Sequence, residues 1–456
     1  MRIFLLSSCL VGMLSAQPSG WRAYFGNLHS HTAVSDGSDR PDRAFRYARQ
    51  DAKVDFLCLS EHNHDIGPNT TQAGLDELAT AALTATTSGF VALVGQEFST
   101  IKNGNHVNVY DVSTQIPRSV LNDYKQLFTE WLPKYQDENQ DRIVVAQFNH
   151  PDDDRKDYGR TKYTIKRDGT TRTLPNFDGD DNAFRTATDK WVRTIAILSG
   201  PADANDKGTT TVDEHADIDP RRVRIWHRYL DLGQHLSPVA DQDNHSKTWG
   251  NRTTARTGTW VQGTLTKQSL LKAFQENRTY ASEDQHLTVW YTINDQPMGA
   301  RLKDVGDQDL NIKVVLNDPD EPQSRYVVRL LRETIGDGEL PVEVDKSATA
   351  LSNNVAWEST IEHLKDHHEA YIVHVTQTGS NGQVNIAWTA PIWIEPAETP
   401  DDHDEEPAFV KSRFSNVYHF ATCAVAEEIK ARGNLIDHNP QAADGTRLHK
   451  HCPSVR

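Results

Sequence analysis

The sequence has little positive charge for its length and no apolar run long enough to cross a membrane. Its 456 residues include 48 Lys and Arg against 64 Asp and Glu, which gives a formal net charge of −16. Tight, non-specific binding to long nucleic acids or anionic membranes depends on Lys and Arg, so this balance disfavours both partners. A small or medium anionic substrate held by metal ions remains compatible with it, because divalent cations reverse the local charge of a site.

The one notable apolar run lies at the N-terminus, over residues 3–14, and follows Met1-Arg2. A charged start, a short apolar segment and small residues up to Ala16 predict a signal peptide over residues 1–16. The run is too short to span a bilayer. Residues 6–9, which end in Cys9, also resemble a lipoprotein cleavage box, although little apolar sequence precedes them. We therefore expect a secreted or periplasmic protein with no membrane span.

The stretch from residue 27 to 37 brings together possible metal ligands. Alternate side chains of an extended strand point to the same face, so His29 and His31 send both imidazoles to one side. Asp36 follows on a turn closed by Gly37, where a short carboxylate can bend back toward the same point. By itself, a His-x-His pair is also compatible with two unrelated histidines at a strand end.

Strand and helix patterns then alternate. Residues 41–52 are typical of a helix entered through a proline, and residues 54–60 of an apolar strand with both faces covered, which predicts a parallel sheet. We interpret Cys58 in this strand as a small buried apolar residue. α/β barrels place their chemistry at the carboxyl ends of such strands. Possible ligands recur at or near strand ends, namely His62, Glu97, His106, His150, Asp243 and His245.

These motifs resemble, in order, the polymerase and histidinol phosphatase (PHP) family of metal-dependent phosphoesterases. The resemblance covers residues 24 to about 282 and implies a distorted seven-stranded β/α barrel over residues 21–284. Similarity in residues 256–260 and 277–284 indicates a secreted branch that includes a carbamate-insecticide hydrolase. The matching motifs are Leu28-His29-Ser30-His31, Ser35-Asp36-Gly37, Ser60-Glu61-His62-Asn63, Gly95-Gln96-Glu97, Gly104-Asn105-His106, Asn149-His150-Pro151 and Asp243-Asn244-His245.

The resemblance also implies two to three divalent ions, with Zn, Mn and Fe all suited to the ligands. Two departures concern Glu61, where many relatives have Asp, and Asp36, where some carry a third histidine. Asp241 is an alternate for Asp243. The implied ligands are His29, His31, Glu97 and Asp243 for one ion, Glu97, His106 and His150 for a second, and Asp36, His62 and His245 for a third.

Such a centre predicts a hydrolase. A hydroxide that bridges two divalent ions is a nucleophile near neutral pH and suits in-line displacement at phosphorus. We expect a phosphomonoester or phosphodiester substrate; a carbamate, ester or amide bond is the alternative at the same site. A non-catalytic binding protein with a structural metal site is a further alternative. His64 is a candidate general acid or a plain loop histidine, and Arg256 a candidate phosphate contact or a structural salt bridge.

A polar insertion follows His150. Asp168-Gly169 between β-rich arms predicts a hairpin within residues 160–174. Because the hairpin comes directly after an implied metal ligand, it is a candidate lid over an anionic substrate, with a solvated surface hairpin as the alternative. Its basic residues include Lys162, Lys166, Arg167 and Arg172.

The residue pattern changes past residue 285. Alternating apolar and polar residues over 285–396 predict an antiparallel β-sandwich of immunoglobulin-like length. We interpret Trp290 and Trp388 as core residues, with carbohydrate binding by exposed rings as the alternative. Residues 397–407, rich in Glu, Asp and Pro, read as an acidic linker.

Residues 408–456 resemble the small metal-binding module of the Ada DNA-repair methyltransferase and predict a small α+β module. That family binds zinc with two cysteine pairs. The matching positions here are His419, Cys423, His449 and Cys452, at spacings that still suit tetrahedral zinc. A disulfide between Cys423 and Cys452 is the equal alternative in an exported protein. So short a module needs either a bound metal or a disulfide to be stable.

Overall fold

The structure is a computed structural model, and it divides the chain into two compact units, Met1–Pro396 and Ala397–Arg456. It describes residues 19–64, 67–99, 106–120, 126–151, 163–164, 171–172, 182–200, 208–303, 305–306, 308–364 and 367–396, and four short strands beyond residue 408. The signal peptide over 1–16 and the linker over 397–407 lie outside the described residues and stay predictions. In the described part, none of the helices is long and apolar enough to cross a membrane.

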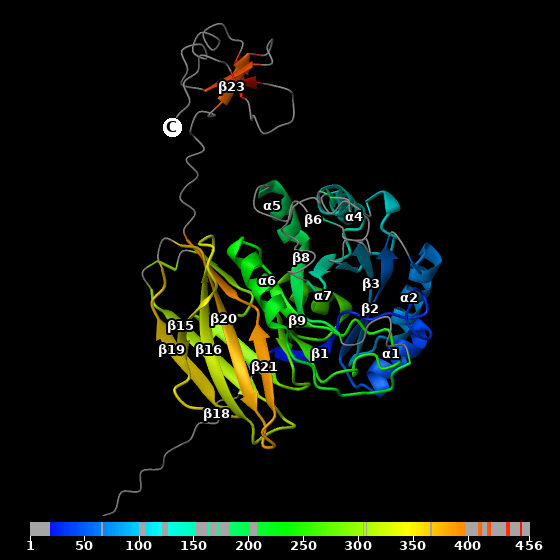
Figure 1. Ribbon diagram of the computed structural model, residues 1–456, viewed down its shortest axis with the longest axis vertical. Helices are drawn as coiled ribbons and strands as arrows, with labels where there is room; N and C mark the ends of the chain where they lie inside the picture. The colour runs from blue at the N-terminus through cyan, green and yellow to red at the C-terminus, as the bar shows by residue number, and fades with distance from the viewer. Residues whose placement is uncertain are drawn as a thin grey trace, which may run out of the picture. The chain divides into compact units, whose positions relative to one another are not determined.

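The first unit is a mixed α/β structure in which parallel strands carry the candidate ligands at their ends (Figure 1). β1 pairs in parallel with β2, β2 with β3, β5 with β8, and β8 with β9, whereas β4 runs antiparallel between β3 and β5. The predicted parallel sheet is thereby confirmed. The strands are β1 (Trp21–Asn27), β2 (Phe56–His64), β3 (Val91–Ser99), β4 (Val107–Tyr110), β5 (Val145–Phe148), β8 (Val192–Leu198) and β9 (Ser237–Ala240).

The helices of this part begin where the sequence supplies caps or proline. α1 has a proline at its first turn, and it buries Ala44, Phe45 and Ala48. Thr71 caps α2, and Thr266 caps α7 in a reciprocal capping box with Ser269. The helices are α1 (Pro41–Gln50), α2 (Gln72–Ala85), α4 (Leu132–Glu138), α5 (Asn182–Trp191), α6 (Pro220–Asp231) and α7 (Lys267–Gln275), with short helices η1 (Arg118–Val120) and η2 (Leu127–Trp131).

The sheet continues on the other side of β1 and curls back toward β9. β10 (Arg256–Gln262) pairs antiparallel with β1, and β11 (Thr279–Ser282) pairs antiparallel with β10. The hydroxyl of Thr257 donates to the carbonyl of Ala240 at 2.8 Å, and the hydroxyl of Thr279 donates to Ser237 Oγ at 2.8 Å. β9 therefore lies beside β10 and β11 through side-chain contacts. The closed seven-stranded barrel itself stays a prediction.

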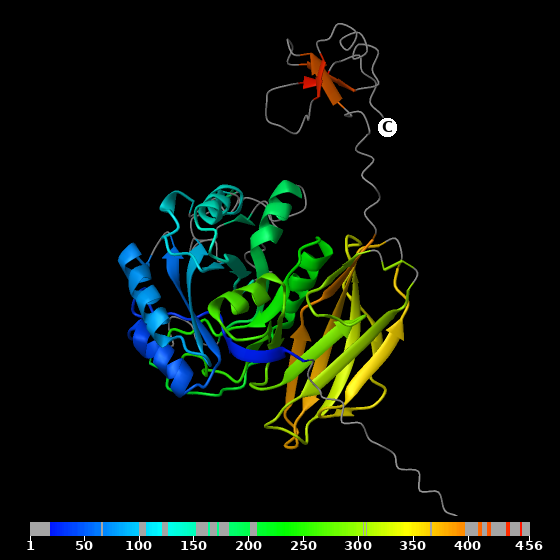
Figure 2. The same cartoon turned by 180° about the vertical axis from the view of Figure 1, so that it is seen from behind.

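Past β11 the chain forms one separate sheet and an extension of the first sheet, which lie face to face (Figure 2). Tyr291, Val314, Tyr326 and Val373 belong to the hydrophobic core that the two share. This agrees with the alternating pattern of the sequence, while the immunoglobulin-like character stays a prediction. One sheet contains β12 (Thr288–Ile293), β13 (Gln296–Pro297), β15 (Leu310–Asn317) and β19 (Ala356–Ile361); the other contains β14 (Arg301–Lys303), β16 (Arg325–Thr334), β17 (Val342–Lys346), β18 (Leu351–Ser352), β20 (Glu369–Thr378), β21 (Val384–Thr389) and β22 (Ile392–Glu395).

The expected boundary near residue 284 is a change of pattern inside one continuous sheet. β11 pairs antiparallel with β21, and Tyr280 stands opposite Thr389. Trp290 is buried, with its ring centroid 4.7 Å from that of Trp260. Trp388 packs against Trp226 of α6 at 6.0 Å between ring centroids. The interpretation as a core residue is confirmed for Trp290, whereas Trp388 is partly buried and packs against the edge of the core.

Glu333 on β16 is a buried carboxylic acid, and neither of its oxygens has a hydrogen-bond partner among the described residues. Burial, together with the charges of Asp231 and Asp337, raises the pKa of Glu333 to about 8. The ordinary value in an unfolded chain is about 4.3. The folded state thus binds this proton more tightly, and ionisation costs stability as the pH rises from about 4 through about 8.

We expect Glu333→Gln to remove this pH-dependent loss, because the amide does not ionise. Urea unfolding at pH 6 and pH 8.5 should show the variant gaining about 1–3 kcal/mol on the wild type at the higher pH, the range for an unsatisfied buried polar group. Equal changes at both pH values would show that the pKa of Glu333 is not raised, because the carboxyl would then be ionised in the folded and the unfolded protein alike.

The insertion and the second unit are described in part. β6 (Tyr163–Thr164) and β7 (Thr171–Arg172) pair antiparallel, which confirms the arms of the predicted hairpin; its turn lies outside the described residues. β23 (Phe409–Ser412), β24 (Val417–Phe420), β25 (Leu435–Asp437) and β26 (Arg447–Leu448) form a sheet of their own in the second unit. The backbone of His419 belongs to β24. Cys423, His449 and Cys452 lie outside the described residues, so the zinc or disulfide stays a prediction.

Candidate metal centre

Two histidines at the end of β1 meet two carboxylates. His29 and His31 are fully buried, and their Nε2 atoms lie 3.1 Å apart. Asp243 Oδ1 stands 3.2 Å from Nε2 of His29 and 3.1 Å from Nε2 of His31. Glu97 Oε1 approaches His29 Nε2 to 3.2 Å. These four residues form a group whose ligand atoms all lie within 4.8 Å of one another and could hold a metal ion.

Glu97 links this group to a second one. It lies on β3 opposite His62 of β2 in a parallel register, so both side chains reach the same end of the sheet. Its Oε1 atom stands 2.8 Å from Nδ1 of His106 and 3.3 Å from Nε2 of His150. Asn149 Nδ2 donates to the same oxygen at 3.0 Å. Glu97, His106 and His150 thus form the second possible metal group.

Asp36 contacts both other candidate ligands of the third group. Its Oδ1 atom lies 3.0 Å from Nε2 of His62 and 3.1 Å from Nε2 of His245, and these two nitrogens are 3.2 Å apart. The His31 ring stacks on both His62 and His245, with centroids 4.1 Å apart in each case. All nine residues that the PHP resemblance implies as ligands are therefore gathered at one place.

The pKa values of two candidate carboxylate ligands are lowered. Burial raises the pKa of Glu97, but His29, His106 and His62 overcome it and hold that pKa well below the ordinary range. Burial likewise opposes ionisation of Asp243, yet His29 and His31 keep its pKa well below the ordinary value. Ionised carboxylates are the form that binds metal.

Unsatisfied buried atoms support the same conclusion. Asp36 Oδ1 and Glu97 Oε2 are buried and accept no hydrogen bond from the described residues, although imidazole nitrogens stand 3.0 and 2.7 Å away. Such close approach without hydrogen-bond geometry leaves these oxygens unsatisfied, which is costly inside a protein. A divalent cation would satisfy them, so this donor set fits the implied ions.

Asp241 and Arg256 have other surroundings. Asp241 Oδ2 accepts from Gln147 Nε2 at 2.7 Å and lies 3.6 Å from Nδ1 of His29, on the opposite edge of that ring from Asp243. This position suits a residue that orients a ligand histidine. Arg256 donates to the backbone carbonyls of Thr253 and Ala255 at 2.5 and 2.8 Å. Because Thr257 turns toward β9, its neighbour Arg256 points to the other face, which favours the structural role over the phosphate contact.

Glu61 has a role that the sequence did not reveal. This buried carboxylate accepts hydrogen bonds from the backbone N–H and the hydroxyl of Thr32, at 2.9 and 2.5 Å, and from the hydroxyl of Ser35 at 2.5 Å. It thereby ties the loop that carries Asp36 to the end of β2. The only sequence signal for this role of Glu61 is its place directly before the candidate ligand His62.

We expect Glu61→Gln to weaken the cation site at Asp36, because the amide cannot accept from both Thr32 and Ser35 in the same way. Loss of a residue that orients a metal ligand typically costs 10–100-fold in metal affinity. Competition with a fluorescent chelator measures the change, and Glu77→Gln on the exposed side of α2 is the control. Unchanged affinity for every bound ion would contradict the positioning role.

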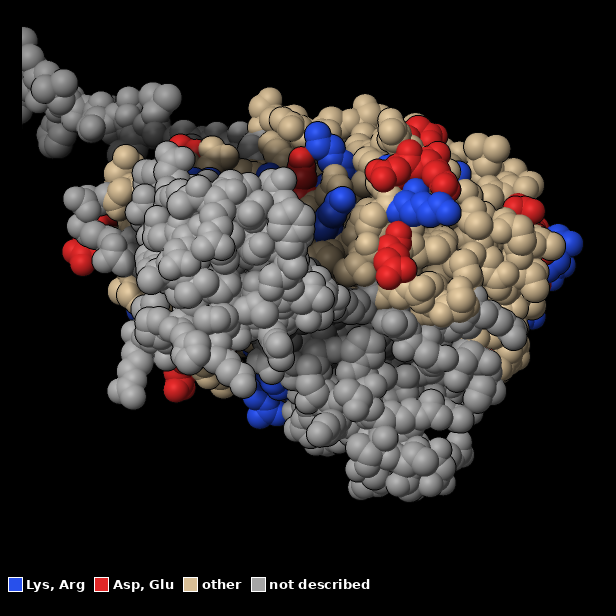
Figure 3. Space-filling view, turned by 90° about the horizontal axis from the view of Figure 1, so that it is seen from above, with Lys and Arg blue, Asp and Glu red and all other residues tan. Residues whose placement is uncertain are grey.

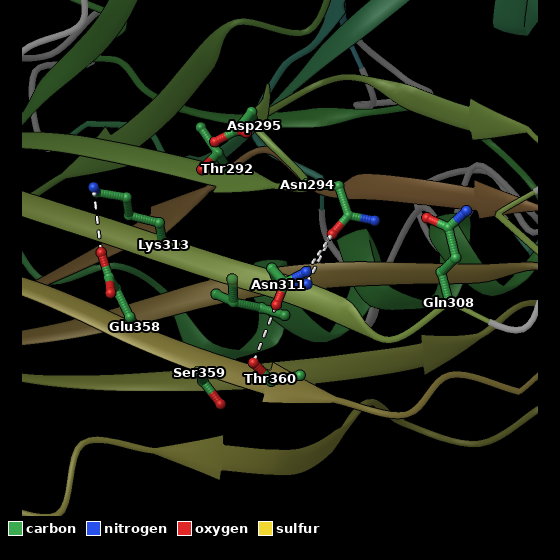
Figure 4. Close-up of a pocket in the computed structure, with 10 residues that line it drawn as sticks. Thr292, Asn294, Asp295, Gln308, Asn311, Lys313, Glu358, Ser359 and Thr360 are labelled. Carbon is green, nitrogen blue, oxygen red and sulfur yellow. Dashed lines mark hydrogen bonds and ion pairs between the residues drawn. The ribbon is translucent and has the colours of Figure 1, made fainter.

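Two hollows lie outside the donor groups. A polar groove of about 700 Å³ on β12, β15 and β19 contains the ion pair of Lys313 and Glu358 at 3.2 Å (Figure 4); it adds no donor to the metal groups. A second hollow of about 410 Å³ is lined by Arg43, Arg46, Lys247 and Trp249 among others. The indole N–H of Trp249 donates to the carbonyl of His31 at 2.9 Å, so one lining residue contacts the backbone of a candidate ligand. On the described surface seen from above, acidic and basic side chains lie next to one another (Figure 3).

Comparisons with known proteins find only remote similarity. A scan against protein-family models gives no match, and a search of curated proteins gives none either. Among solved structures, the chain is similar to a two-domain protein from Bacteroides vulgatus described as containing a predicted PHP-like metal-dependent phosphoesterase, with 15% identity, a TM-score of 0.40, and coverage of 79% of this chain and 92% of that chain. The soluble domain of PmoD from a Methylocystis species is similar over 24% of this chain and 90% of its own, with 13% identity and a TM-score of 0.18. The assignment of the site rests on its own geometry.

Proposed function

We propose that the protein is a metal-dependent hydrolase that cleaves a phosphomonoester or a phosphodiester. The observation that carries this proposal is the set of three adjoining His, Asp and Glu groups around the buried Glu97, at the carboxyl ends of parallel strands. Donors in such number exceed what a closed structural site needs.

The residues of the chain would hold two to three Zn, Mn or Fe ions, in the groups described above. Divalent ions, when bound there, supply Lewis acidity and lower the pKa of water. The protein's own part is to fix the ligands: Asp241 lies behind His29, and Glu61 ties down the loop of Asp36. Burial of His29, His31 and Glu97 keeps bulk water from competing for the same contacts.

The hollow beside Trp249 supports a phosphoester over the alternative carbamate, ester or amide. Lys247 follows the ligand His245 by two residues, and its ammonium lies 3.5 Å from Asp39, which also pairs with Arg43 at 3.1 Å. Two cations thus share one carboxylate; Arg46 adds a third positive charge to the lining and Asp51 a second carboxylate, which leaves an excess of one positive charge. Such a hollow favours a negatively charged group.

The remaining proposals concern the rest of the chain. We propose export by the 1–16 signal peptide, a closed PHP-type barrel with an immunoglobulin-like sandwich, and an Ada-like module that holds one zinc or one disulfide. The hairpin over 160–174 is proposed as a lid. Its deletion should raise the Michaelis constant for an anionic substrate. An unchanged Michaelis constant would contradict the proposal that the hairpin is a lid.

The test is metal analysis together with hydrolysis of aryl phosphate mono- and diesters and an aryl carbamate, on the wild type and on His31→Ala. Two to three equivalents of transition metal with phosphoesterase activity lost in the variant would support the proposal. Activity on the carbamate alone would move the assignment to the alternative hydrolase. Metal bound only by the second unit, with no turnover, would rule out the metal centre of the first unit and favour a binding protein.

A further inference from the structure

We propose that His64 is a metal ligand, which together with Nδ1 of His62 and Oε2 of Glu97 forms a cation position beyond the three groups implied by the PHP resemblance. The inference rests on the metal centre of the proposed function but not on the reaction assigned to it. Its chemistry is that of a divalent transition-metal ion bound by two imidazoles and one carboxylate.

Local structure aims His64 into the centre. Leu57 and Leu59 of β2 pack with α1 and α2, so the alternate residues Ser60, His62 and His64 face the opposite side. His62-x-His64 therefore repeats at the end of β2 the arrangement of His29-x-His31 at the end of β1. The backbone of His64 is clamped by Asn69, which accepts from its N–H and donates to its carbonyl, both at 2.7 Å. His64 is 2% exposed, so its ring is held in place.

The three candidate donor atoms have the spacing of ligands around one ion. His62 Nδ1 lies 2.7 Å from Glu97 Oε2 and 3.2 Å from Nε2 of His64, and the remaining pair, His64 Nε2 and Glu97 Oε2, is 3.7 Å apart. Tetrahedral ligands at the usual zinc–nitrogen distance of about 2.0–2.1 Å stand about 3.3 Å from one another. The residues form a group that could hold a metal ion in their own right.

Hydrogen bonding by a neutral imidazole does not account for this arrangement. Glu97 Oε2 accepts no hydrogen bond from the described residues, despite the 2.7 Å approach of His62 Nδ1. The other nitrogen of His62, Nε2, already faces Asp36 at 3.0 Å. A neutral imidazole carries one N–H and one lone pair, so it can neither donate nor bind a cation on both edges. With a cation on each edge the ring would bind as an imidazolate, its N–H proton being released to solvent, and both carboxylates would be satisfied.

The same contacts disfavour the role of His64 as a general acid. A proton donor needs access to the leaving group of the substrate, within hydrogen-bond reach. Nε2 of His64 instead points at atoms of two other candidate ligands, and the ring packs against that of His106 with centroids 4.4 Å apart. Its surroundings are those of a ligand.

The experiment compares the full-length wild type with His64→Phe, His64→Cys and the control His374→Phe, a histidine that packs on Trp388 of the sandwich. Metal content is measured by mass spectrometry after dialysis against Zn²⁺, and absorption after loading with Co²⁺. We expect His64→Phe to hold one equivalent less than the wild type and the control. Because a coordinating thiol is deprotonated, Co²⁺-loaded His64→Cys should keep the equivalent and gain a thiolate-to-cobalt band in the near ultraviolet.

Unchanged metal content in His64→Phe, together with no thiolate band in folded His64→Cys, would overturn the proposal. If hydrolysis then fell at constant metal content, His64 would be a proton donor. If His64→Phe failed to fold by circular dichroism, the cobalt band of His64→Cys would decide alone. A wild type that binds the ions but hydrolyses no phosphoester would contradict the proposed function. The metal content of the wild type and the variants would still decide whether His64 is a ligand.

Discussion

Glu97→Gln should lose most of its bound metal and reduce any hydrolytic activity by more than about 100-fold. Oε1 of Glu97 lies within 3.3 Å of His29, His106 and His150, and Oε2 faces His62. The amide removes the negative charge on which all of these contacts depend. Since residues that merely orient a ligand cost 10–100-fold when lost, a carboxylate shared between groups should cost more. Metal content and turnover on the best aryl ester measure the loss.

The matched control is Glu276→Gln, in which an exposed carboxylate at the end of α7 is changed in the same way. It should leave metal content and turnover as in the wild type. Because the amide of Gln has nearly the shape of the carboxylate, a loss in Glu97→Gln alone can be assigned to charge. Full metal content in Glu97→Gln would contradict the placing of Glu97 at the junction of the groups.

Removal of the metal ions by a chelator should lower the melting temperature of the first unit by about 10 °C. A ligand that binds only the folded state stabilises it by about 4 kcal/mol at a concentration 1,000 times the dissociation constant, so two ions contribute about 8 kcal/mol. In a unit as long as Met1–Pro396, each kcal/mol is worth about 1.2 °C. Without the ions, the clustered carboxylates lose the positive charge that offsets theirs, and the imidazole nitrogens lose their bound cation. Calorimetry with and without a chelator measures the shift.

Acid should reduce this difference, because protonated histidines do not bind metal. The melting temperatures with and without chelator should therefore converge as the pH falls below the range in which the ligands are deprotonated. His31→Ala supplies the control, since a variant with a damaged centre should respond less to the chelator. A wild type that melts at the same temperature with and without chelator would show that the ions do not stabilise the fold.

Several features of this protein could be predicted from local sequence because they depend on periodicity. The His29-x-His31 alternation places both rings in one group, and the apolar run from residue 54 to 60 corresponds to most of β2. Trp290 was interpreted as a core residue on the same grounds and is 8% exposed. The order of strands and candidate ligands carried the resemblance to the PHP family, since these residues lie within or next to strands whose period is readable along the chain.

Other features were decided by contacts between residues far apart in the chain. Asp241 and Asp243 are two residues apart, yet only Asp243 reaches the group of His29, because the strand ends at Ala240 and Asp243 adopts a left-handed φ of 46°. Local periodicity no longer applies past that point. The continuity of β11 with β21 likewise joins residues more than a hundred positions apart and crosses the boundary that the pattern near residue 284 suggested.

Single side chains show the same division. The sequence marked His64 and Arg256 as candidates with two roles each, and Glu61 and Glu333 as acidic residues without a role. Which of the two faces each side chain occupies follows from strand pairing, and pairing follows from the packing of the whole unit. The sequence by itself determined the candidate ligands and their order along the chain. Only the tertiary structure decided which polar groups of the described residues are buried without partners, because burial is a property of the assembled core.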